Sequence, residues 1–464
     1  MNNELVFFDS LKGEKIKFSP VDKNNIRVYA CGPTVYDFAH IGNARMAVSC
    51  DVLIRILRLI YKKVTFVSNI TDIDDKIIKK SLELKKPIWE ITKKFQKIYN
   101  QDMKNLGVKH PDIQPKATDY ITNIIKAIND LLKSKNAYVY QGHVLFHVPS
   151  YSHYGNLSKR TIEEQIAGNR VDVAPFKKNK SDFVLWKPSK SNEPSWNSPW
   201  GPGRPGWHIE CTVMSQKTLG LPFDIHCGGV DLKFPHHENE IAQSCSLVGK
   251  DTEPEKFSKY WFHNGFVQIN DKKMSKSLGN YKLICNLLRE YSGDCVKFAL
   301  LSSHYRQPLN WTEKILDQAK KNINRLNQLN EDTKDTKISR EEEIKFTDDI
   351  RKTLLDDINT PNAFGILNKI SKKFSKKDLM LRKIMKANLN FIKKTLGLFC
   401  KDSNNRRSIK IGDLKNKKIE KLIEERNDAR SKKDYKKADQ LRDKLKELGI
   451  DLNDSKNKTI WKRN

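Results

Sequence analysis

Near the start of the chain a short strand, a glycine-bearing turn, a long helix and a second strand follow one another, and this order is the strongest constraint on the fold. Residues 26–30 have the β-branched and aromatic composition of a strand, and the turn 31–33 ends it. Apolar residues recur at helical spacing from 41 to 59, and residues 64–67 form a second strand. The alternation predicts a doubly wound parallel α/β sheet, in which ligands bind beyond the carboxyl ends of the strands.

The pattern changes twice further along. Residues 115–205 have the composition of an insertion with long loops, above all the Trp/Pro/Ser/Gly-rich segment 186–206. The αβ pattern returns at residues 223–226, a strand that we expect to end in the turn 227–229, and Pro235 lies where a helix could start. After about residue 310 the sequence is polar and helical in period.

Size and composition indicate a globular protein. The 464 residues, 38% of them hydrophobic, suggest about three domains. The chain does not begin with a basic flank followed by an apolar stretch, and no apolar run approaches the roughly 18 residues that span a bilayer. We therefore expect a cytoplasmic protein without a membrane partner. The net charge of +30 favours nucleic-acid binding, but codon bias in a chain rich in Lys, Asn and Ile explains it equally well.

The eight cysteines are scattered and form no closely spaced framework, which argues against disulfides. We expect five of them to be ordinary core residues: Cys50, Cys245, Cys285, Cys295 and Cys400.

Two motifs suit the binding of a nucleoside triphosphate. His40-Ile41-Gly42-Asn43 lies at the expected start of the first helix, where N–H groups and the helix dipole favour phosphate oxygens. Gly42 leaves room for a flat base, while His40 and Asn43 can donate hydrogen bonds to the phosphates. Lys273-Met274-Ser275-Lys276-Ser277 follows the strand-like residues 266–269, so we expect a mobile loop after a hairpin. Its two lysines can neutralise a departing pyrophosphate.

The chain resembles the class I cysteinyl-tRNA synthetases over essentially its whole length. The first motif is part of a family-like block, residues 31–45, and the lysine loop through Gly279-Asn280 is a second. Further blocks that resemble the family are residues 69–76, 206–211 and 234–240.

A metal site is also expected. His236 and Glu240 are spaced i, i+4, so a helix would present both on one face, and Cys31 and Cys211 are each expected at a turn. Two thiolates, an imidazole and a carboxylate form a plausible zinc set, and the resemblance implies the same four residues. The alternative is that the cysteines are core thiols and His236 is a surface residue.

Zinc would select a thiol substrate, because the harder serine hydroxyl cannot reproduce a metal–thiolate interaction. The resemblance implies that Gly32, Thr71, Trp207 and His226 line the amino-acid pocket. Core packing for Trp207 and helix capping for Thr71 are the alternatives. Cys227, where the family often carries glycine, could approach the metal, but we interpret it as a tolerated small residue.

The last sixty residues favour RNA binding once the resemblance is taken into account. Residues 424–430 and 438–443 are expected on two helices, after a linker at 401–407. Arg426, Arg430, Lys433, Arg442 and Trp461 could hold bases and phosphates. By composition alone, a solvated pair of helices would explain them.

The resemblance thus implies an enzyme that activates L-cysteine with ATP, with Mg²⁺ accompanying the ATP and one zinc per subunit, and transfers cysteine to tRNA(Cys) as a monomer. The expected catalytic residues are Thr34, His40, Asn43, Lys273 and Lys276, and those expected to bind ATP are His40, Gly42, Asn43, Lys273, Ser275 and Lys276. The alternatives are a ligase that transfers cysteine to an amino sugar and a non-catalytic zinc protein that binds RNA. The expected parts are a Rossmann-type catalytic domain in two halves (1–117 and 204–253), a connective insertion (118–203), a stem-contact region with the lysine loop (254–310), a helical bundle (311–403) and an anticodon-binding domain (404–464).

Overall fold

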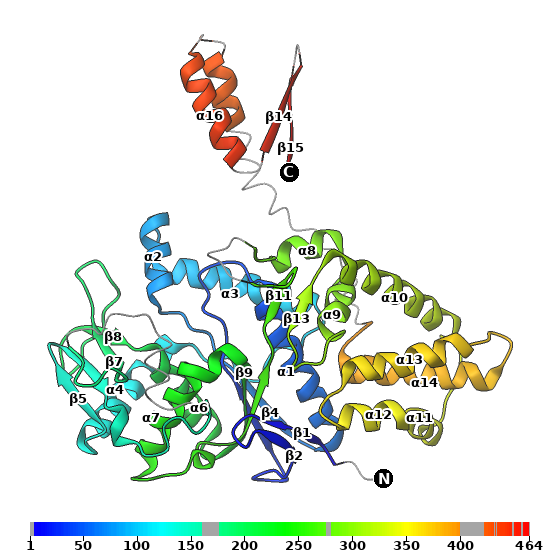
Figure 1. Cartoon of the computed structure of the whole chain (residues 1–464), viewed down its shortest axis with the longest axis horizontal. Coiled ribbons are helices and arrows are strands. Elements are labelled where there is room, and N and C mark those ends of the chain that lie inside the picture. The colour runs from blue at the N-terminus through cyan, green and yellow to red at the C-terminus, as the bar shows by residue number, and fades with distance from the viewer. Residues whose placement is uncertain are drawn as a thin grey trace. The chain divides into compact units, whose positions relative to one another are not determined.

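The computed structural model describes residues 4–159, 176–274, 280–399, 422–430, 432, 434–447, 450–455 and 458–463 (Figure 1). The chain divides into two compact units, Met1–Arg406 and Arg407–Asn464. In the part that is described, no helix is both long and apolar enough to cross a membrane.

A four-stranded parallel sheet is the centre of the first unit. Its order is β10 (Ser258–Asn264), β9 (Phe223–Gly229), β3 (Ile26–Ala30) and β4 (Val64–Ser68). Val28 of β3 pairs with residues of both neighbouring strands, Phe66 and Ile225. The two strands predicted near the N-terminus, and the parallel α/β sheet, are therefore confirmed.

The strand predicted at residues 223–226 is longer than expected. β9 continues through Gly229, which pairs with Asn264 of β10, so the turn predicted at 227–229 is wrong. Glycine is required inside this strand because a Cβ on Gly228 would lie 2.5 Å from the ring of His237. Close approach of a neighbouring side chain, and not a chain reversal, accounts for the glycine at this position.

Helices cover both faces of the sheet (Figure 1). On one face α1 (Ile41–Ile60), as predicted, joins β3 to β4 and is buried along most of its length. On the other face α6 (Trp207–Leu219) packs against β3 and β4, and α7 (Glu238–Val248) packs against α6. Two separate apolar cores result, one on each side of the sheet.

The insertion contains more regular structure than its composition predicts. An antiparallel sheet has the order β5 (Ala137–Tyr140), β6 (His143–Phe146), β7 (Phe183–Pro188) and β8 (Gly203–Pro205). The ends of the segment predicted as a long loop, 186–206, are thus strands. Trp186 is fully buried in this sheet, so it serves as a core residue and not as part of a loop.

The first unit also contains short strands and further helices outside the central sheet and the insertion. The strands are β1 (Val6–Asp9), β2 (Glu14–Lys17), β11 (Val267–Ile269), β12 (Lys272–Lys273) and β13 (Leu309–Trp311). The helices before residue 310 are α2 (Asp75–Leu84), α3 (Ile88–Asn105), α4 (Ile121–Lys133), α8 (Ile284–Glu290) and α9 (Gly293–Leu301). The helical region predicted after residue 310 is present as α10 (Glu313–Asp332), α11 (Arg340–Phe346), α12 (Asp348–Leu355), α13 (Thr360–Lys373) and α14 (Leu379–Leu396).

The second unit contains the two predicted helices, residues 422–430 and α16 (Tyr435–Glu447), and a hairpin of β14 (Ile450–Ser455) and β15 (Lys458–Arg463). Arg426 is only 3% exposed, so its expected exposure is wrong. It lies one helical turn after Leu422, on the face that the unit buries. The linker 401–407, Cys400 and Lys433 lie outside the described residues, as does the side chain of Trp461.

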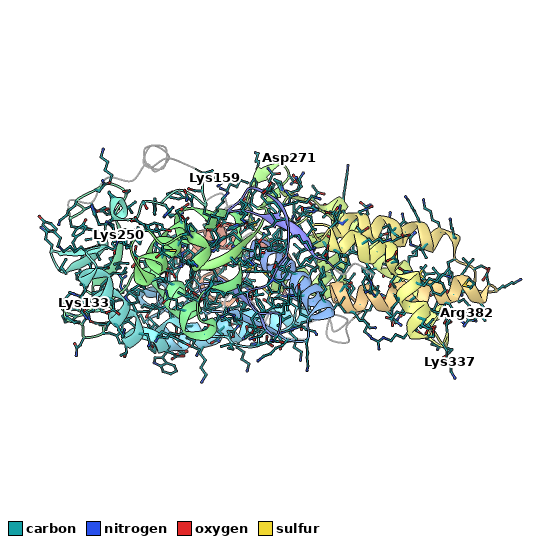
Figure 2. All side chains as sticks on the ribbon, turned by 90° about the horizontal axis from the view of Figure 1, so that it is seen from below. Lys133, Lys159, Lys250, Asp271, Lys337 and Arg382 are labelled. Atoms are coloured by element: carbon teal, nitrogen blue, oxygen red, sulfur yellow. The ribbon has the colours of Figure 1, made fainter. Side chains whose placement is uncertain are left out.

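Basic side chains occur at both ends of the first unit. Figure 2 shows Lys133 and Lys250 at the end formed by the insertion, and Lys337 at the opposite end, formed by the helical region. This spread agrees with the interpretation that part of the positive charge is ordinary surface lysine.

Candidate functional site

A cleft of about 440 Å³ opens at the carboxyl ends of the strands, next to the start of α1. Eight of the residues predicted to form a site line it: Cys31, Gly32, Thr34, His40, Gly42, Asn43, Trp207 and Lys273. Trp207, expected in the amino-acid pocket, contributes to the same wall. The cleft thus brings together residues from both nucleotide motifs and from the expected metal site.

A reciprocal capping box orients the two polar residues of the first motif. The backbone N–H of Asn43 donates to His40 Nδ1 (3.3 Å), and the N–H of His40 donates to Asn43 Oδ1 (3.1 Å). Because Nδ1 accepts, a neutral His40 ring carries its proton on Nε2. His40 Nε2 and Asn43 Nδ2 are therefore the donor atoms that these side chains can offer to an anion at the helix N-terminus.

Backbone hydrogen bonds join the first motif to the segment just after the lysine loop, more than two hundred residues later in the chain. The N–H of Ile41 donates to the carbonyl of Lys282 (3.0 Å), and the N–H of Ile284 donates to the carbonyl of Ala39 (2.9 Å). A Cβ on Gly42 would lie 3.0 Å from Cε of Met274. The absence of a side chain at Gly42 therefore also allows the lysine loop to approach the first turn of α1.

The hairpin before the lysine loop is present, since β11 and β12 pair in antiparallel fashion. Lys273 is exposed at the end of β12, and its Nζ lies 6.0 Å from the centre of the Phe266 ring. Ser275 and Lys276 lie outside the described residues, so their roles stay predictions.

The floor of the cleft is formed by two backbone segments in contact. The N–H of Gly32 donates to Asn69 Oδ1 (2.8 Å), and Thr34 and Thr71 form a parallel bridge. A Cβ on Gly32 would lie only 1.6 Å from the carbonyl oxygen of Asn69. Glycine is thus required at this position, because any side chain would separate the turn after β3 from the chain that follows β4.

The four predicted metal ligands meet beneath this floor. Donor atoms of Cys31, Cys211, His236 and Glu240 all lie within 4.8 Å of one another, and all four residues are buried. Cys31 Sγ is 3.4 Å from His236 Nε2 and donates to Glu240 Oε1 (3.2 Å), while His236 Nε2 and Glu240 Oε1 are 2.9 Å apart. Zinc bonds of about 2.0–2.3 Å place tetrahedral donors roughly 3.3–3.8 Å apart, so the cluster has nearly the size of a zinc site.

Electrostatics also suit a cation. Burial raises the pKa of the Cys31 thiol, while a hydrogen bond from Cys31 lowers the pKa of the Cys211 thiol to about 6. Burial would raise the pKa of Glu240, but the neighbouring His226 and His236 outweigh it and lower the pKa to about 2. The cluster therefore already holds a carboxylate and a thiol that loses its proton easily, the forms in which these groups bind metals.

One local expectation at this cluster is wrong. Cys211 does not lie at a turn; it is in the second turn of α6, and Gly206 ends the preceding loop. The helix that carries Glu240 begins at Glu238, and Phe234, before Pro235, is extended (φ −140°, ψ 134°). His236 lies in the irregular turn just before it, and still contacts Glu240 as the i, i+4 spacing predicts.

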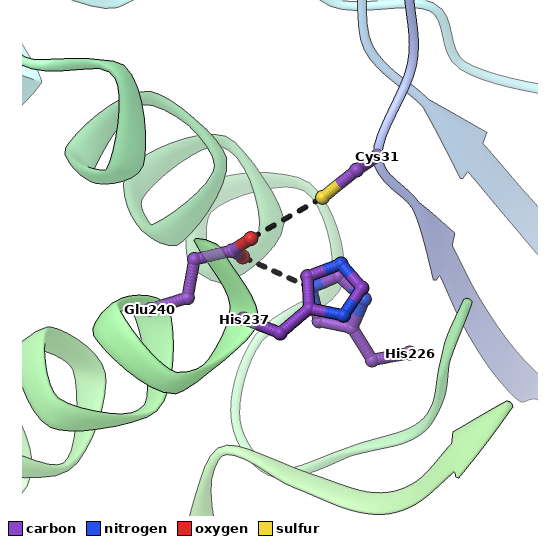
Figure 3. A group of neighbouring side chains, drawn as sticks. All are labelled: Cys31, His226, His237 and Glu240. Carbon is purple, nitrogen blue, oxygen red and sulfur yellow. Dashed lines mark hydrogen bonds and ion pairs between the residues drawn. The ribbon is translucent and has the colours of Figure 1, made fainter. Parts of the chain in front are cut away.

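A second group of possible ligands lies deeper: Cys31, His226, His237 and Glu240 (Figure 3). His226 Nε2 hydrogen-bonds Glu240 Oε2 (2.9 Å), and its ring stacks on Trp261 with centres 4.6 Å apart. His237 Nδ1 hydrogen-bonds His263 Nε2 (2.8 Å). Among the described residues, those lining the cleft include neither His226 nor His237, whereas Trp207, which lines it, stacks on His236 of the first group.

The residues expected to hold the amino acid are divided between the cleft and the layer behind it. Gly32 and Trp207 line the cleft, and Trp207, 40% exposed, stacks on His236 with ring centres 4.2 Å apart. Thr71 and His226 are buried and do not reach the described lining. Cys227 lies on the opposite face of the sheet from His226, in the core that contains α1.

Sequence reasoning missed two residues that orient the site. His208 Nδ1 lies 3.0 Å from His236 Nδ1, the ring atom on the side away from the cluster, and Asn69 Oδ1 accepts from both Gly32 and Cys211 Sγ (3.7 Å). A ligand histidine usually has such a partner on its second nitrogen. The signal for His208 was its position three residues before Cys211; for Asn69 only the family-like block indicated importance.

Comparison with known proteins gives a consistent result. Residues 17–321 match the catalytic domain of the class I (C) tRNA synthetases, and residues 416–461 match the cysteinyl-tRNA ligase anticodon binding domain. The cysteine–tRNA ligase of Parvibaculum lavamentivorans is 44% identical over 99% of this chain and 98% of its own length. That of Pelagibacter ubique is 43% identical over the full length of both chains.

A solved structure supports the fold independently. The methionyl-tRNA synthetase of Mycobacterium tuberculosis superposes with a TM-score of 0.57 over 81% of this chain and 92% of its own, at 13% identity. Together with the parallel sheet and the cleft at its carboxyl edge, these similarities leave one assignment: the chain belongs to the cysteine–tRNA ligase family of class I aminoacyl-tRNA synthetases.

Proposed function

We propose that the protein joins L-cysteine to tRNA(Cys) in two steps. Cysteine and ATP first give cysteinyl-adenylate and pyrophosphate, and the cysteinyl group then passes to the terminal ribose of the tRNA. The observation that carries the choice of amino acid is the convergence of Cys31, Cys211, His236 and Glu240 directly beneath the nucleotide cleft. These four residues are the zinc ligands that we propose.

When bound there, zinc would supply a Lewis acid that a thiol can bind as thiolate and that a hydroxyl binds far less well. The protein's own residues do the rest of the selection. Trp207 forms one wall of the amino-acid site, and Gly32 lets the turn after β3 lie against Asn69 in the floor of that site. A site built for one polar group can reject an analogue without it by roughly 10⁴-fold, so no separate editing domain is required.

In the activation step the substrate carboxylate attacks the α-phosphorus of ATP, and the bond to the pyrophosphate oxygen breaks. His40 Nε2 and Asn43 Nδ2 would donate to the phosphates at the start of α1, with Thr34 and Gly42 beside them. Lys273, Ser275 and Lys276 would neutralise the charge that develops on the pyrophosphate, with Mg²⁺ accompanying the ATP. Positioning and electrostatic stabilisation account for the catalysis, and no general base is needed.

The transfer step distinguishes this function from transfer of cysteine to an amino sugar. The match of residues 416–461 to an anticodon-binding domain favours tRNA as the acceptor. We further propose that the protein acts as a monomer in the cytoplasm, where its tRNA is. We also propose that the segments expected from the sequence serve as the catalytic domain, the connective insertion, the stem-contact region, the helical bundle and the anticodon-binding domain.

One two-stage assay tests the proposal. Purified protein should exchange pyrophosphate into ATP only when cysteine is present, should reject serine, and should then charge tRNA(Cys). No exchange would contradict an enzyme of this kind, and exchange without charging would favour the amino-sugar ligase. Active protein without zinc, or equal activation of serine, would contradict the proposed basis of selection.

A further inference from the structure

The junction of α2 and α3 exposes apolar side chains that a stable protein normally buries. Leu82 is 52% exposed, Leu84 is 46% exposed and Trp89 is 64% exposed. They lie within eight consecutive residues, and every residue from 82 to 87 is exposed. We call residues 79–94 the α2–α3 tip. An exposed patch of this kind marks a binding surface more often than a single exposed leucine does.

The exposure follows from the way α2 leaves the body of the protein. Ile77 and Ile78, in the first half of α2, are buried. Leu82 continues the same face one turn later, where it is exposed. The turn is held in a defined shape, because Lys85 closes α2 with φ 50° and Pro87 precedes α3 with φ −63°. The apolar side chains are therefore presented to solvent by ordered backbone.

The same segment is strongly basic. Residues 76–97 contain eight lysines but only two glutamates, Glu83 and Glu90. Each glutamate is already paired with a lysine, Glu83 with Lys80 (3.8 Å) and Glu90 with Lys86. An aromatic ring among lysines suits a polyanion with flat groups, whereas protein–protein interfaces are depleted in lysine at their cores.

The tip is also correctly placed for the proposed reaction. Lys76, in the first turn of α2, lines the cleft, and its Nζ lies 5.9 Å from the centre of the Tyr36 ring, which lines it too. Figure 1 shows α2 projecting from the body of the first unit. Its ten residues span about 15 Å, the length of about four stacked nucleotides. A strand of RNA whose end lies in the cleft would pass along this helix.

We propose that the α2–α3 tip binds the single-stranded 3′ end of tRNA. Trp89 stacks on an unpaired base, Leu82 and Leu84 contact the base or ribose beside it, and Lys85 and Lys86 bind phosphates. This assignment rests on the proposed function, because it assumes that the 3′ end of the tRNA enters the cleft. It adds an RNA-binding surface in the catalytic unit to the anticodon-binding domain at the other end of the chain.

The first experiment compares Trp89→Ala and Trp89→Phe in the full-length protein. Trp89→Ala should raise the KM for tRNA(Cys) roughly 5- to 150-fold, the range expected when stacking on one base is removed. Pyrophosphate exchange should not change, because none of the described residues that line the cleft belongs to the tip. Trp89→Phe should restore most of the affinity, since phenylalanine keeps an aromatic face. Leu59→Ala is the control, an exposed leucine in the last turn of α1, at the opposite edge of the sheet.

The second experiment uses the salt dependence of tRNA binding. In the Lys85→Ala/Lys86→Ala double variant, the slope of log affinity against log salt should become shallower by about 0.7 for each phosphate that a lysine no longer neutralises, or about 1.4 in all. The Lys62→Ala/Lys63→Ala variant, two exposed lysines just before β4, should keep the wild-type slope.

The outcomes separate the two proposals. Wild-type protein that neither exchanges pyrophosphate nor charges tRNA contradicts the proposed function. Wild-type protein that charges tRNA, with an unchanged KM and salt slope in the tip variants, contradicts the RNA-binding tip alone. A dimer in sedimentation that Trp89→Ala dissociates, again with unchanged KM, would show that a second copy of the chain covers the tip and would also overturn the proposal.

Discussion

At the scale of residues, the proposed zinc site depends on the donor atoms of Cys31, Cys211, His236 and Glu240. Cys31 lowers the pKa of the Cys211 thiol, and the Glu240 carboxylate contacts both Cys31 and His236, so each donor depends on the others. Removal of one ligand therefore leaves the rest buried, charged and without a cation. We therefore expect these four residues to determine which amino acid is selected.

Cys211→Ala should remove zinc from the purified protein and abolish cysteine-dependent pyrophosphate exchange, because three ligands and the substrate cannot complete the site. Metal analysis and the exchange assay measure the two effects. Cys227→Ala is the matched control: this thiol is equally buried, but on the opposite face of the sheet. Full zinc content and normal exchange in Cys211→Ala would remove Cys211 from the ligand set.

His208→Asn tests the partner of a ligand. His208 lies 3.0 Å from the second ring nitrogen of His236, and loss of such a partner typically weakens metal binding by about 10- to 100-fold. Competition with a zinc chelator measures the change, and His110→Asn, on an exposed loop, should have none. If the zinc affinity of His208→Asn equals that of the wild type, His208 does not orient His236.

The residues of this site were predictable in part. The sequence identifies Cys31, Cys211, His236 and Glu240 because each falls within a recognisable block. The roles of Asn69 and His208 could not be read in the same way, since they depend on how closely two distant segments approach. His226 illustrates the limit: the resemblance implies that it lines the amino-acid pocket, but its burial beside Glu240 follows only from the tertiary structure.

At the scale of elements, a buried group of charges fastens α1 to its neighbours. Asp51 of α1 accepts from Arg55 Nε (2.8 Å) and from Lys297 Nζ of α9 (2.8 Å), and both cations also donate to the carbonyl of Gly107. All three side chains are almost fully buried. Although burial raises the pKa of Asp51, the two cations outweigh it and lower the pKa below its usual value.

Asp51→Asn should lower the free energy of unfolding by about 3–5 kcal/mol at pH 7, since it leaves two buried cations without a counter-charge. Because the folded pKa of Asp51 is depressed, its contribution is complete above about pH 4 and is lost as the pH falls through the folded value. The difference between wild type and variant in urea unfolding should therefore shrink below about pH 4. Asp130→Asn, which breaks an exposed pair with Lys126, should cost less than about 1 kcal/mol at any pH. A difference that stays constant to low pH would contradict this role of Asp51.

Elements fixed by local periodicity were the easiest to predict. β3, α1 and β4 agree with expectation to within one residue, because alternation and helical spacing are properties of the segment itself. The insertion's sheet was missed since its partners are remote: Trp186 pairs with Val144 on one side and Pro205 on the other. The end of β9 was misplaced because glycine indicates a turn unless one knows that His237 packs on Gly228.

At the scale of the whole molecule, the chain separates into two units that we expect to divide the work. The catalytic cleft and the metal cluster lie wholly within the first, Met1–Arg406. The second, Arg407–Asn464, contains the segment that resembles an anticodon-binding domain. We therefore expect amino-acid activation and recognition of the far end of tRNA to be separable.

Removal of residues 407–464 should leave cysteine-dependent exchange unchanged and greatly raise the KM for tRNA(Cys), because the cleft keeps all its residues and the RNA has one binding surface fewer. Kinetics of exchange and of charging measure the two effects on the same preparation. The Trp89→Ala change made in this truncated protein should weaken tRNA binding further if the two surfaces act independently. A loss of exchange on truncation would mean that the second unit supports the cleft.

The order of strands in the sheet has a consequence for biosynthesis. β3 lies between β4, which follows it closely in the chain, and β9. Cys31, at the end of β3, contacts Glu240, which is synthesised 209 residues later. At about 5–20 residues per second, a ribosome needs roughly 10–40 s to make the intervening chain. During that time the nascent protein exposes one edge of β3 and an incomplete set of thiol ligands. Every molecule of the enzyme passes through this interval. Before β9 and Glu240 have been translated, a strand of another chain could pair with the open edge of β3, and an oxidant could react with the thiols.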